Sequence, residues 1–415
     1  MQFGIFYEHQ LPKPWTDDDE FCLLRDALDQ VELADRLGFD YAWEVEHHFL
    51  DEYSHSSAPE VFLAAAAART KRIRLGHGIR QVIPKYNHPA RTAEALATLD
   101  LISNGRVDFG IGEGATRLEL HGFDIPAKQK RAMALETAEQ IANMMVLDPY
   151  PGYTSDTFTM PCRNVLPKPR QKPHPPMWMA CTNRDTIKVA ARNGIGALAF
   201  SFIDPDEARS WVELYYDIIR SDECVPLGHA VNANIALVTG FSLHDDRPEA
   251  IRRGQEGFDF FGYALNALVA HDQVPGRTDL WGEFQARRSP DSVGRRIAAA
   301  AEQGSSFASC IGTPDDAGRY LRQMRDVGVD QVIFIQQAGR NTHVDICSSL
   351  ELFASDVMPE FAADEADRQQ RKTAELAPFV EAALARKVWM QPLADADIPV
   401  VRASVAKAQT AGSLA

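Results

Sequence analysis

Two histidines follow a short apolar stretch and form the most chemically suggestive group in the chain. Residues 41–49 read as a buried strand that breaks off into Glu46, His47 and His48. If that strand belongs to a parallel sheet, its carboxyl end is where reactive side chains gather. Imidazole changes its charge near neutral pH, so these residues could exchange protons with a bound molecule. They could equally form a salt-linked loop without a chemical role.

The same histidines could instead bind a metal ion, as they do in many barrel hydrolases. His47 and His48 are adjacent, however, and neighbouring residues of a strand point to opposite faces, whereas a shared ion favours spacings such as His-X-His. Hydrolysis by a serine nucleophile has less support, because no Gly-X-Ser-X-Gly motif occurs. Metal binding therefore stays open as the alternative.

One loop of the chain has the composition of an anion-binding site. Cys181, Thr182 and Asn183 lie between a predicted strand and a predicted helix. Free amides of this loop and the Thr182 hydroxyl could hold a phosphate at the positive end of the helix. In the alternative interpretation, Thr182 or Asn183 merely caps that helix.

A second loop is rich in glycine. Residues 110–114 read Gly-Ile-Gly-Glu-Gly, which is not the dinucleotide-binding pattern Gly-X-Gly-X-X-Gly because the third glycine falls one residue early. Gly112 and Gly114, on either side of Glu113, would more simply let the backbone approach a flat ligand.

All these candidates follow predicted strands, and the strands alternate with helices. Strands are predicted at residues 2–7, from residue 41, and at residues 73–79, 107–111, 177–181, 196–200, 232–240 and 331–336. Helices are predicted at residues 16–37, 61–68, 89–102, 127–147, 185–193, 207–221, 248–268, 315–327 and 345–358. Eight strand–helix units favour an α/β fold closed into a (β/α)8 TIM barrel over an open doubly wound sheet.

Two segments interrupt the barrel and one follows it. Proline and glycine recur in residues 149–176, which predicts an irregular insertion, and residues 270–311 lack periodicity, which suggests a mobile lid. We expect a barrel domain over residues 1–360. Residues 361–415 would form a C-terminal arm for packing or dimerisation, with one helix at residues 364–386 and a polar, alanine-rich tail.

Composition excludes several classes of function. A net charge of -15 argues against binding to nucleic acid or to an anionic lipid surface, because both require clustered lysine and arginine. The six cysteines form no Cys-X-X-Cys pair, which argues against a zinc ribbon or a disulfide scaffold and fits a reducing cytoplasm. We see neither a signal peptide nor an apolar run near the roughly 20 residues of a membrane span, so we expect a cytoplasmic protein.

A series of short motifs recurs along residues 1–358 in a fixed order. They are Met1-Gln2-Phe3-Gly4-Ile5-Phe6, Leu37-Gly38-Phe39-Asp40, Glu46-His47-His48-Phe49, Arg74-Leu75-Gly76, His88-Pro89-Ala90-Arg91, Ser103-Asn104-Gly105-Arg106-Val107-Asp108-Phe109-Gly110-Ile111-Gly112, Ala190-Ala191-Arg192-Asn193-Gly194, Ile311-Gly312-Thr313-Pro314 and Phe353-Ala354-Ser355-Asp356-Val357-Met358-Pro359. In order and spacing, this set resembles the bacterial luciferase-like family of flavin-dependent monooxygenases.

The resemblance implies a barrel that binds reduced FMN supplied by a separate NAD(P)H:flavin reductase. The reduced FMN would react with O2 to give a C4a-(hydro)peroxyflavin that oxygenates an organic substrate, while the lid excludes water. His47 matches the family's catalytic histidine, and His48 would point away from the flavin. A non-prolyl cis peptide behind the flavin ring would fall near Gly78-Ile79, and a homodimer is expected. The cofactor-binding candidates are Gly78, Ile79, Gly112, Glu113, Gly114, Cys181, Thr182 and Asn183.

Two residues depart from the family pattern. Glu113 stands where an arginine often neutralises the phosphate, so Arg117 or Arg184 would replace it, or Thr182 and backbone amides would hold the flavin. Cys181 stands where small or acidic residues are common. Its position at a helix N-terminus could lower the pKa of the thiol, although a small apolar residue there needs no such role.

Three functional hypotheses remain. The first is an FMN-dependent monooxygenase acting on a mostly apolar small molecule. Apolar residues of the lid and the preceding helix could line its substrate site, or could be ordinary core: Phe258, Phe260, Phe261, Leu265, Leu268, Leu280, Trp281 and Phe284. The second is a deazaflavin-dependent oxidoreductase that transfers hydride without oxygen. The third is a flavin-binding relative without catalytic activity.

Overall fold

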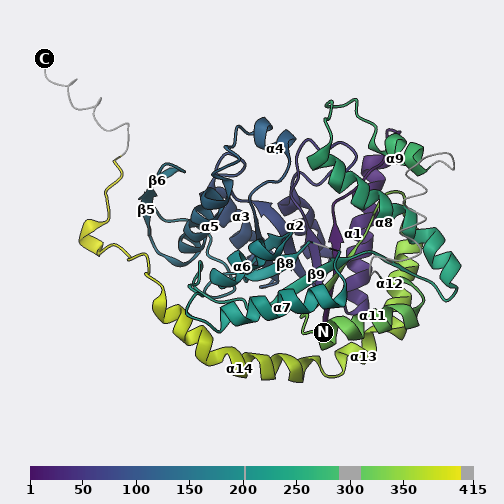
Figure 1. The fold of residues 1–415 in the computed structure, drawn as a ribbon. Helices are drawn as coiled ribbons and strands as arrows, with labels where there is room; N and C mark the ends of the chain where they lie inside the picture. The colour runs from purple at the N-terminus through teal and green to yellow at the C-terminus, as the bar shows by residue number, and fades with distance from the viewer. Residues whose placement is uncertain (201, 289–309, 403–415) are drawn as a thin grey trace, which may run out of the picture.

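Eight parallel strands close into a barrel in the structure, a computed structural model that describes residues 1–200, 202–288 and 310–402 (Figure 1). The barrel strands are β1 (Gln2–Tyr7), β2 (Tyr41–Glu44), β3 (Arg74–Gln81), β4 (Val107–Gly112), β7 (Met177–Cys181), β8 (Gly196–Ala199), β9 (Ile235–Thr239) and β12 (Gln331–Ile335). The ring closes where β1 pairs with β12, with Phe3 beside Val332. The predicted (β/α)8 TIM-barrel class is confirmed.

Helices surround the barrel and begin and end where local chemistry favours it. They are α1 (Asp19–Leu37), α2 (Pro59–Arg69), α3 (Pro89–Ile102), α5 (Lys130–Val146), α6 (Arg184–Arg192), α7 (Pro205–Ile219), α8 (Arg247–Ala270), α11 (Pro314–Asp326) and α12 (His343–Asp356). Gly38 ends α1 in the left-handed conformation, with φ of 98°. Pro89 occupies the first turn of α3, where no amide hydrogen is needed.

Several short elements differ from the expectation. The insertion at residues 149–176 contains an antiparallel hairpin of β5 (Tyr150–Thr154) and β6 (Thr159–Arg163). A short helix α4 (Arg117–Gly122) precedes α5, and β10 (Phe241–Leu243) pairs with β11 (Cys310–Gly312). Within the expected lid, α9 (Leu280–Arg288) is helical, and residues 289–309 lie outside the described residues.

Two apolar clusters build the interior. The larger one lies between the barrel and its helices and includes Phe3 and Phe334, whose ring centroids are 6.0 Å apart. The smaller one joins Trp43 and Trp178, from the barrel strands, to Phe261 and other residues of α8. Burial of these side chains supplies the main stabilisation of the fold. None of the described helices combines the length and the apolar character that crossing a membrane requires.

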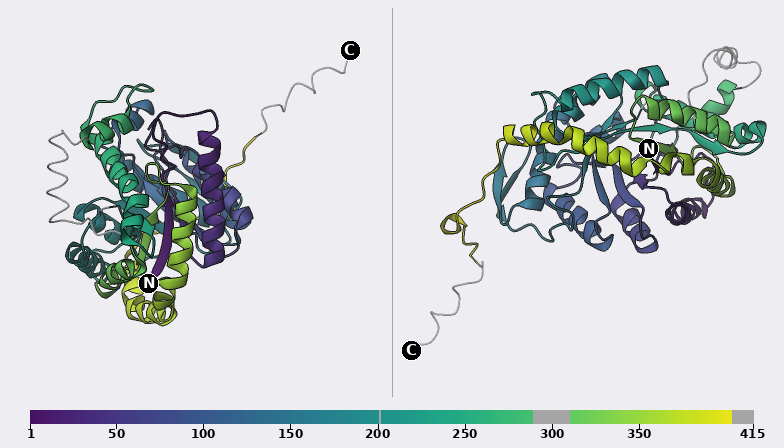
Figure 2. Two further views of the ribbon diagram at one scale, coloured as in Figure 1. Left: turned by 90° about the vertical axis from the view of Figure 1, so that its right-hand side faces the viewer. Right: turned by 90° about the horizontal axis from the view of Figure 1, so that it is seen from below.

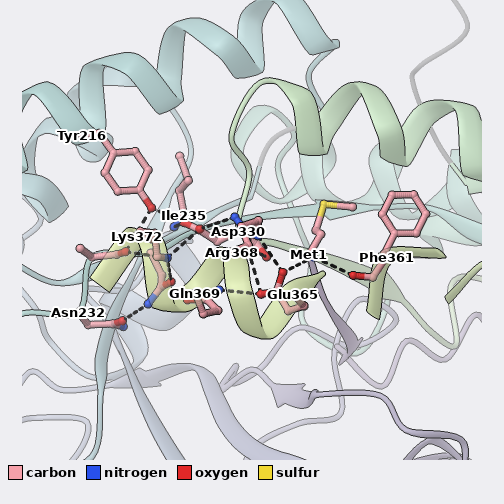
Figure 3. A network of polar contacts seen from close by, with 12 residues as sticks. Met1, Tyr216, Asn232, Ile235, Asp330, Phe361, Glu365, Arg368, Gln369 and Lys372 are labelled. Atoms are coloured by element: carbon pink, nitrogen blue, oxygen red, sulfur yellow. Dashed lines mark hydrogen bonds and ion pairs between the residues drawn. The ribbon is translucent and has the colours of Figure 1, made fainter. Parts of the chain in front are cut away.

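The C-terminal arm packs against the amino-terminal end of the barrel. After α13 (Met358–Ala362), the long helix α14 (Glu365–Arg386) runs along the lower side of the barrel in Figure 1 and crosses in front of it in the view from below (Figure 2, right). Arg368 and Lys372 of α14 both contact Asp330, which is 1% exposed and precedes β12 (Figure 3). The opposite end of the barrel, where the strands terminate, is therefore the open one.

Candidate active site

A cavity of about 240 Å³ lies at the carboxyl end of the barrel strands. Residues from β1, β2, β3, β4, β7, β8, β9 and β12 or the loops that follow them line it, together with residues of α5 and α8. Most of its wall is apolar, and charged side chains gather in two places. One charged group surrounds His47, and the other surrounds Glu113.

His47 lies in the loop after β2 and is held between two carboxylates. Its Nδ1 hydrogen donates to Glu119 Oε1 at 2.8 Å, and its Nε2 is 3.8 Å from Glu8 Oε2. The amide of His47 donates to the carbonyl of Ser56 at 2.9 Å, which fixes the backbone of the loop. The imidazole lines the cavity, so its Nε2 edge is available to a bound molecule.

The carboxylates decide the charge of this imidazole. Burial alone would lower the pKa of His47, but Glu119 and Glu8 outweigh it and raise the pKa to about 9. For the Glu119 carboxyl, burial acts in the other direction and would raise the pKa. His47 and the hydrogen bonds from Thr116 and the amide of His48 outweigh burial and hold the pKa of Glu119 below its ordinary value. His47 and Glu119 therefore form a charged pair at neutral pH.

Glu8 differs from Glu119 because it has fewer partners. Tyr53 donates to Glu8 Oε1 at 3.0 Å, while the buried Oε2 has no hydrogen-bond partner. Burial raises the pKa of Glu8 to about 7, against the opposing influence of His47 and Tyr53. A buried oxygen without a partner at the wall of a cavity can bind a polar atom of a ligand.

His48 lies on the other side of the loop, as the resemblance implied. Its Nε2 is 3.1 Å from Glu46 Oε1, and its ring stacks on Tyr86 with centroids 6.1 Å apart. Glu46 also accepts a hydrogen bond from the amide of Gln81 at 3.0 Å. Neither His48 nor Glu46 lines the cavity, so they stabilise the loop from behind.

Glycine residues of the neighbouring strands β3 and β4 line the next part of the cavity wall. The Gly78–Ile79 peptide is cis, which confirms the position implied by the resemblance, and both residues line the cavity. Gly112 also lines it, and a Cβ atom there would overlap the side chain of Ile79. Gly114 has φ of +76°, a conformation that glycine adopts without strain. Glycine at position 112 therefore makes room for the Ile79 side chain, which forms part of the apolar wall.

Glu113, in a second charged part of the cavity wall, is paired with two cations. Arg131 Nη2 donates to Glu113 Oε1 at 2.9 Å, and Lys130 Nζ is 3.4 Å from the same oxygen. Both basic residues come from the start of α5. Arg117 and Arg184 do not take the place of the missing arginine, so that expectation is wrong. Neither lines the cavity, and Arg184 is bound to Glu207 outside it.

The loop after β7 caps the start of helix α6 instead of forming an open anion-binding site. Asn183 Oδ1 accepts hydrogen bonds from the amides of Asp185 and Thr186, and Thr186 Oγ1 accepts from those of Thr182 and Asn183. The amides that were expected to be free are therefore occupied. Thr182 lines the cavity with its neighbour Thr186, whereas Asn183 does not.

Cys181 is also absent from the wall of the cavity. Its side chain is 0% exposed, and burial raises the pKa of the thiol to about 12. The expectation of a lowered thiol pKa is wrong, because loss of hydration outweighs the helix N-terminus. Cys181 acts as a small buried residue.

The apolar stripe on α8 and α9 divides between two roles. Leu265 and Leu268 line the cavity, as does Val269 beside them. The remaining members do not reach the cavity and pack in the smaller apolar cluster: Phe258, Phe260, Phe261, Leu280, Trp281 and Phe284. The core interpretation therefore holds for most of the stripe.

Sequence reasoning missed most partners of His47. Tyr53 carries no local signal, and Glu8 appears only as a polar residue after the first strand. Glu119 could have been found, because Thr116 and Glu119 match the Ser/Thr-X-X-Glu capping box that begins a helix. The structure shows that pattern, with the Thr116 hydroxyl accepting from the amide of Glu119 at 3.2 Å. In the described part of the chain, no group of three or more histidine, cysteine or acidic side chains is arranged to hold a metal ion.

Comparison with known proteins places this geometry among related enzymes. Residues 1–331 match the luciferase-like monooxygenase family. The chain is 28% identical over 371 residues to limonene 1,2-monooxygenase of Rhodococcus erythropolis, covering 88% of this chain and 87% of that enzyme. The chain also resembles the crystal structure of monooxygenase RslO1 from Streptomyces bottropensis, with a TM-score of 0.69. The two sequences are 27% identical, and the match covers 87% of this chain and 100% of the other.

A third similarity concerns the fold alone. The oxygenating constituent of 3,6-diketocamphane monooxygenase from Pseudomonas putida, solved in complex with FMN, is 18% identical. Its TM-score is 0.67, and the match covers 86% of this chain and 98% of that one. The barrel geometry is therefore shared well beyond recognisable sequence identity.

Proposed function

Because the chain belongs to the luciferase-like monooxygenase family, we propose that it uses reduced FMN and O2 to oxygenate a mostly apolar small organic molecule. In this proposal a separate NAD(P)H:flavin reductase supplies the reduced FMN. The observation that carries the proposal is the position of His47. Its charged imidazole faces a largely apolar cavity and is held there by two buried carboxylates. The homodimer stays a prediction.

The chemistry of the cavity wall fits a flavin mononucleotide. Gly78, Ile79 and Gly112 would lie against the flat ring system. The absence of a side chain at Gly78 and Gly112 leaves room for Trp43 and Ile79, which complete this wall. Lys130 and Arg131 would provide positive charge for the phosphate at the other end. A planar apolar group joined to an anionic group matches both ends of the cavity.

The residues of the chain then have distinct tasks. Reduced flavin, when bound, supplies the electrons that activate O2 for insertion of one oxygen atom into the substrate. With a pKa of about 9, His47 is protonated at pH 7.5, so its Nε2 hydrogen can be donated to an oxygen atom in the cavity. Glu8 can accept or donate a hydrogen bond through its unpaired oxygen. Leu265 and Leu268 exclude water and contact the substrate.

Oxygen uptake with chemically reduced FMN tests the proposal. We expect a panel of apolar aldehydes, ketones and terpenes to contain a compound that gains one oxygen atom, identified by mass. His47→Ala should lower the rate of product formation by roughly 100-fold or more, the scale of one general acid–base group. Flavin affinity should stay within a few fold, because the apolar wall remains.

The control is His121→Ala, which alters an exposed histidine of α4 that does not line the cavity. It should keep the full rate. A His47→Ala enzyme as fast as the wild type would contradict the role of His47. Turnover of a deazaflavin without oxygen consumption would favour hydride transfer, and flavin retention without turnover of any compound would favour a non-catalytic relative.

A further inference from the structure

Glu113 occupies the cations that a phosphate group would need. Its carboxylate accepts from both Nε and Nη2 of Arg131, and Lys130 approaches the same group. All three residues line the cavity, and their side chains are partly exposed to solvent, by 18% for Glu113, 24% for Lys130 and 39% for Arg131. A guanidinium group binds a carboxylate and a phosphate through the same two-pronged geometry. The two anions therefore compete for one site.

Little else at this end of the cavity can compensate for the competition. Lys130 and Arg131 are the only lysine and arginine among the described residues that line the cavity. Side chains of Asn183 and Thr186 already bind four amides at the start of α6, those of Thr182, Asn183, Asp185 and Thr186. The hydroxyl of Thr182, which lines the cavity, is a neutral donor. A phosphate must thus share the two cations with Glu113 or displace its carboxylate.

We propose that the Glu113 carboxylate competes with the flavin phosphate for Lys130 and Arg131, and that this competition keeps the affinity for FMN moderate. This inference rests on the proposed function. A carboxylate in place reduces the charge available to a phosphate dianion from two positive groups to a net single one. The phosphate must also break the Glu113–Arg131 hydrogen bonds before it forms its own.

A moderate affinity suits a flavin that arrives reduced from another protein and leaves after each cycle. Differences in affinity between related complexes arise mainly from the rate of dissociation. Competition by Glu113 shortens the residence time of FMN while the apolar wall keeps the ring in its place. The same carboxylate holds Lys130 and Arg131 in position between two flavin-binding events.

Binding of oxidised FMN and of riboflavin, measured by quenching of flavin fluorescence, tests the inference without turnover. Riboflavin has the same ring system and lacks the phosphate. We expect Glu113→Gln to bind FMN about tenfold more tightly, the scale of a released hydrogen bond between charged groups. Riboflavin affinity should change less than about twofold, because the ring contacts are the same. Arg131→Met should reduce FMN affinity toward that of riboflavin.

Glu207→Gln is the matched control. Glu207 binds Arg184 through two hydrogen bonds of 3.0 and 2.7 Å, outside the cavity, so its loss should leave both flavin affinities unchanged. Weaker or unchanged FMN binding in both Glu113→Gln and Glu113→Ala would overturn the inference, as would an equal gain for riboflavin. It would also fail if Arg131→Met bound FMN normally. Wild-type protein that binds neither oxidised FMN nor reduced FMN would overturn the proposed function itself.

Discussion

His47 lies between two carboxylates whose surroundings move their pKa values in opposite directions. Glu119 receives hydrogen bonds from His47, Thr116 and the amide of His48, so its charged form is stabilised. Glu8 has Tyr53 and an oxygen without a partner, so burial dominates and its pKa rises to about 7. Because the groups interact closely, the protons bound near neutral pH belong to the network as a whole.

Glu119 is a positioning residue, and removing its charge should lower the pKa of His47. Burial lowers the pKa of His47, and the charge of Glu119 is the largest influence that raises it. Because Glu119→Gln removes this charge, the pKa of His47 should fall from about 9 by at least one unit. Titration of the His47 ring signals by NMR measures this directly. The wild-type imidazole should stay protonated at pH 7.5, and the pH profile of the reaction rate should shift to lower pH in the variant.

The same pKa determines the sign of a stability effect. A folded-state pKa of about 9, above the ordinary 6.5, means that protonated His47 stabilises the fold. This contribution is complete below pH 6.5 and is lost as pH rises through 9. The stabilisation of the fold by protonated His47 should be smaller in Glu119→Gln. Glu20→Gln, which alters the exposed partner of His55, is the control and should leave His47 unchanged. An unaltered titration of His47 in Glu119→Gln would remove Glu119 from the network.

The sequence identified His47 but not the residues that determine its charge. His47 follows a strand in a recognisable motif, so its place at the barrel mouth could be predicted. Glu119 is 72 residues away and belongs to the six-residue helix α4, which no apolar periodicity reveals. Lys130 and Arg131 stand in the first turn of a long helix, where basic residues normally face water. Only the closed barrel brings these residues to one cavity.

At the level of elements, the start of α6 illustrates two alternatives that sequence could not separate. A strand that ends at Cys181 and a helix that begins at Arg184 leave two residues between them. Such a turn can aim its amides at a ligand or satisfy them with its own side chains. The structure has the second arrangement, because Asn183 and Thr186 form a complete capping box.

Asn183→Ala should therefore affect stability and not flavin binding. Loss of its two hydrogen bonds to the helix amides should reduce the free energy of unfolding by about 1 kcal/mol. Urea unfolding measures the loss, and fluorescence quenching should give the same FMN affinity as the wild type. Asp204→Ala provides the comparison, because Asp204 caps α7 through the amide of Glu207 at 2.8 Å. A large loss of FMN affinity without loss of stability would return Asn183 to the binding site.

The elements that sequence missed are short and lie outside the barrel. Most barrel strands are predicted because a short run of mainly apolar residues alternates with helical segments. The hairpin of β5 and β6 contains Pro151, Gly152 and Pro161, which argue against strands in general but are tolerated at an exposed edge. The pairing of β10 with β11 joins segments about 70 residues apart in sequence, which no local pattern predicts.

Across the whole molecule, the two ends of the barrel have separate tasks. Charged and apolar groups of the proposed reaction lie at the carboxyl end, and α14 covers the amino-terminal end (Figure 2). The helix of the arm was predicted within one residue, at 364–386 against Glu365–Arg386. The place where this helix packs was not predicted, because the contact depends on Asp330. This buried carboxylate lies 38 residues from Arg368 and 42 from Lys372 in sequence.

Lys372→Met should weaken this attachment while leaving the carboxyl end intact. Lys372 Nζ donates to Asp330 Oδ1 at 2.8 Å and to the carbonyl of Ala233 at 3.2 Å (Figure 3). Methionine keeps the apolar stem but leaves Asp330 with less compensation for its burial. Arg368, the amide of Ile235 and Tyr216 still bind the carboxylate, so the loss in free energy of unfolding should be about 1 to 3 kcal/mol.

Urea unfolding of Lys372→Met and of Lys188→Met separates this attachment from an ordinary surface ion pair. Lys188 binds Asp185, which is 86% exposed, so its replacement should cost less than about 1 kcal/mol. FMN affinity should be unchanged in both variants, since neither residue lines the cavity. Equal losses for the two lysines would mean that the contact between Lys372 and Asp330 contributes no more than a surface ion pair. A larger loss at Lys372 with normal flavin binding would show that the arm stabilises the barrel from the end opposite to its chemistry.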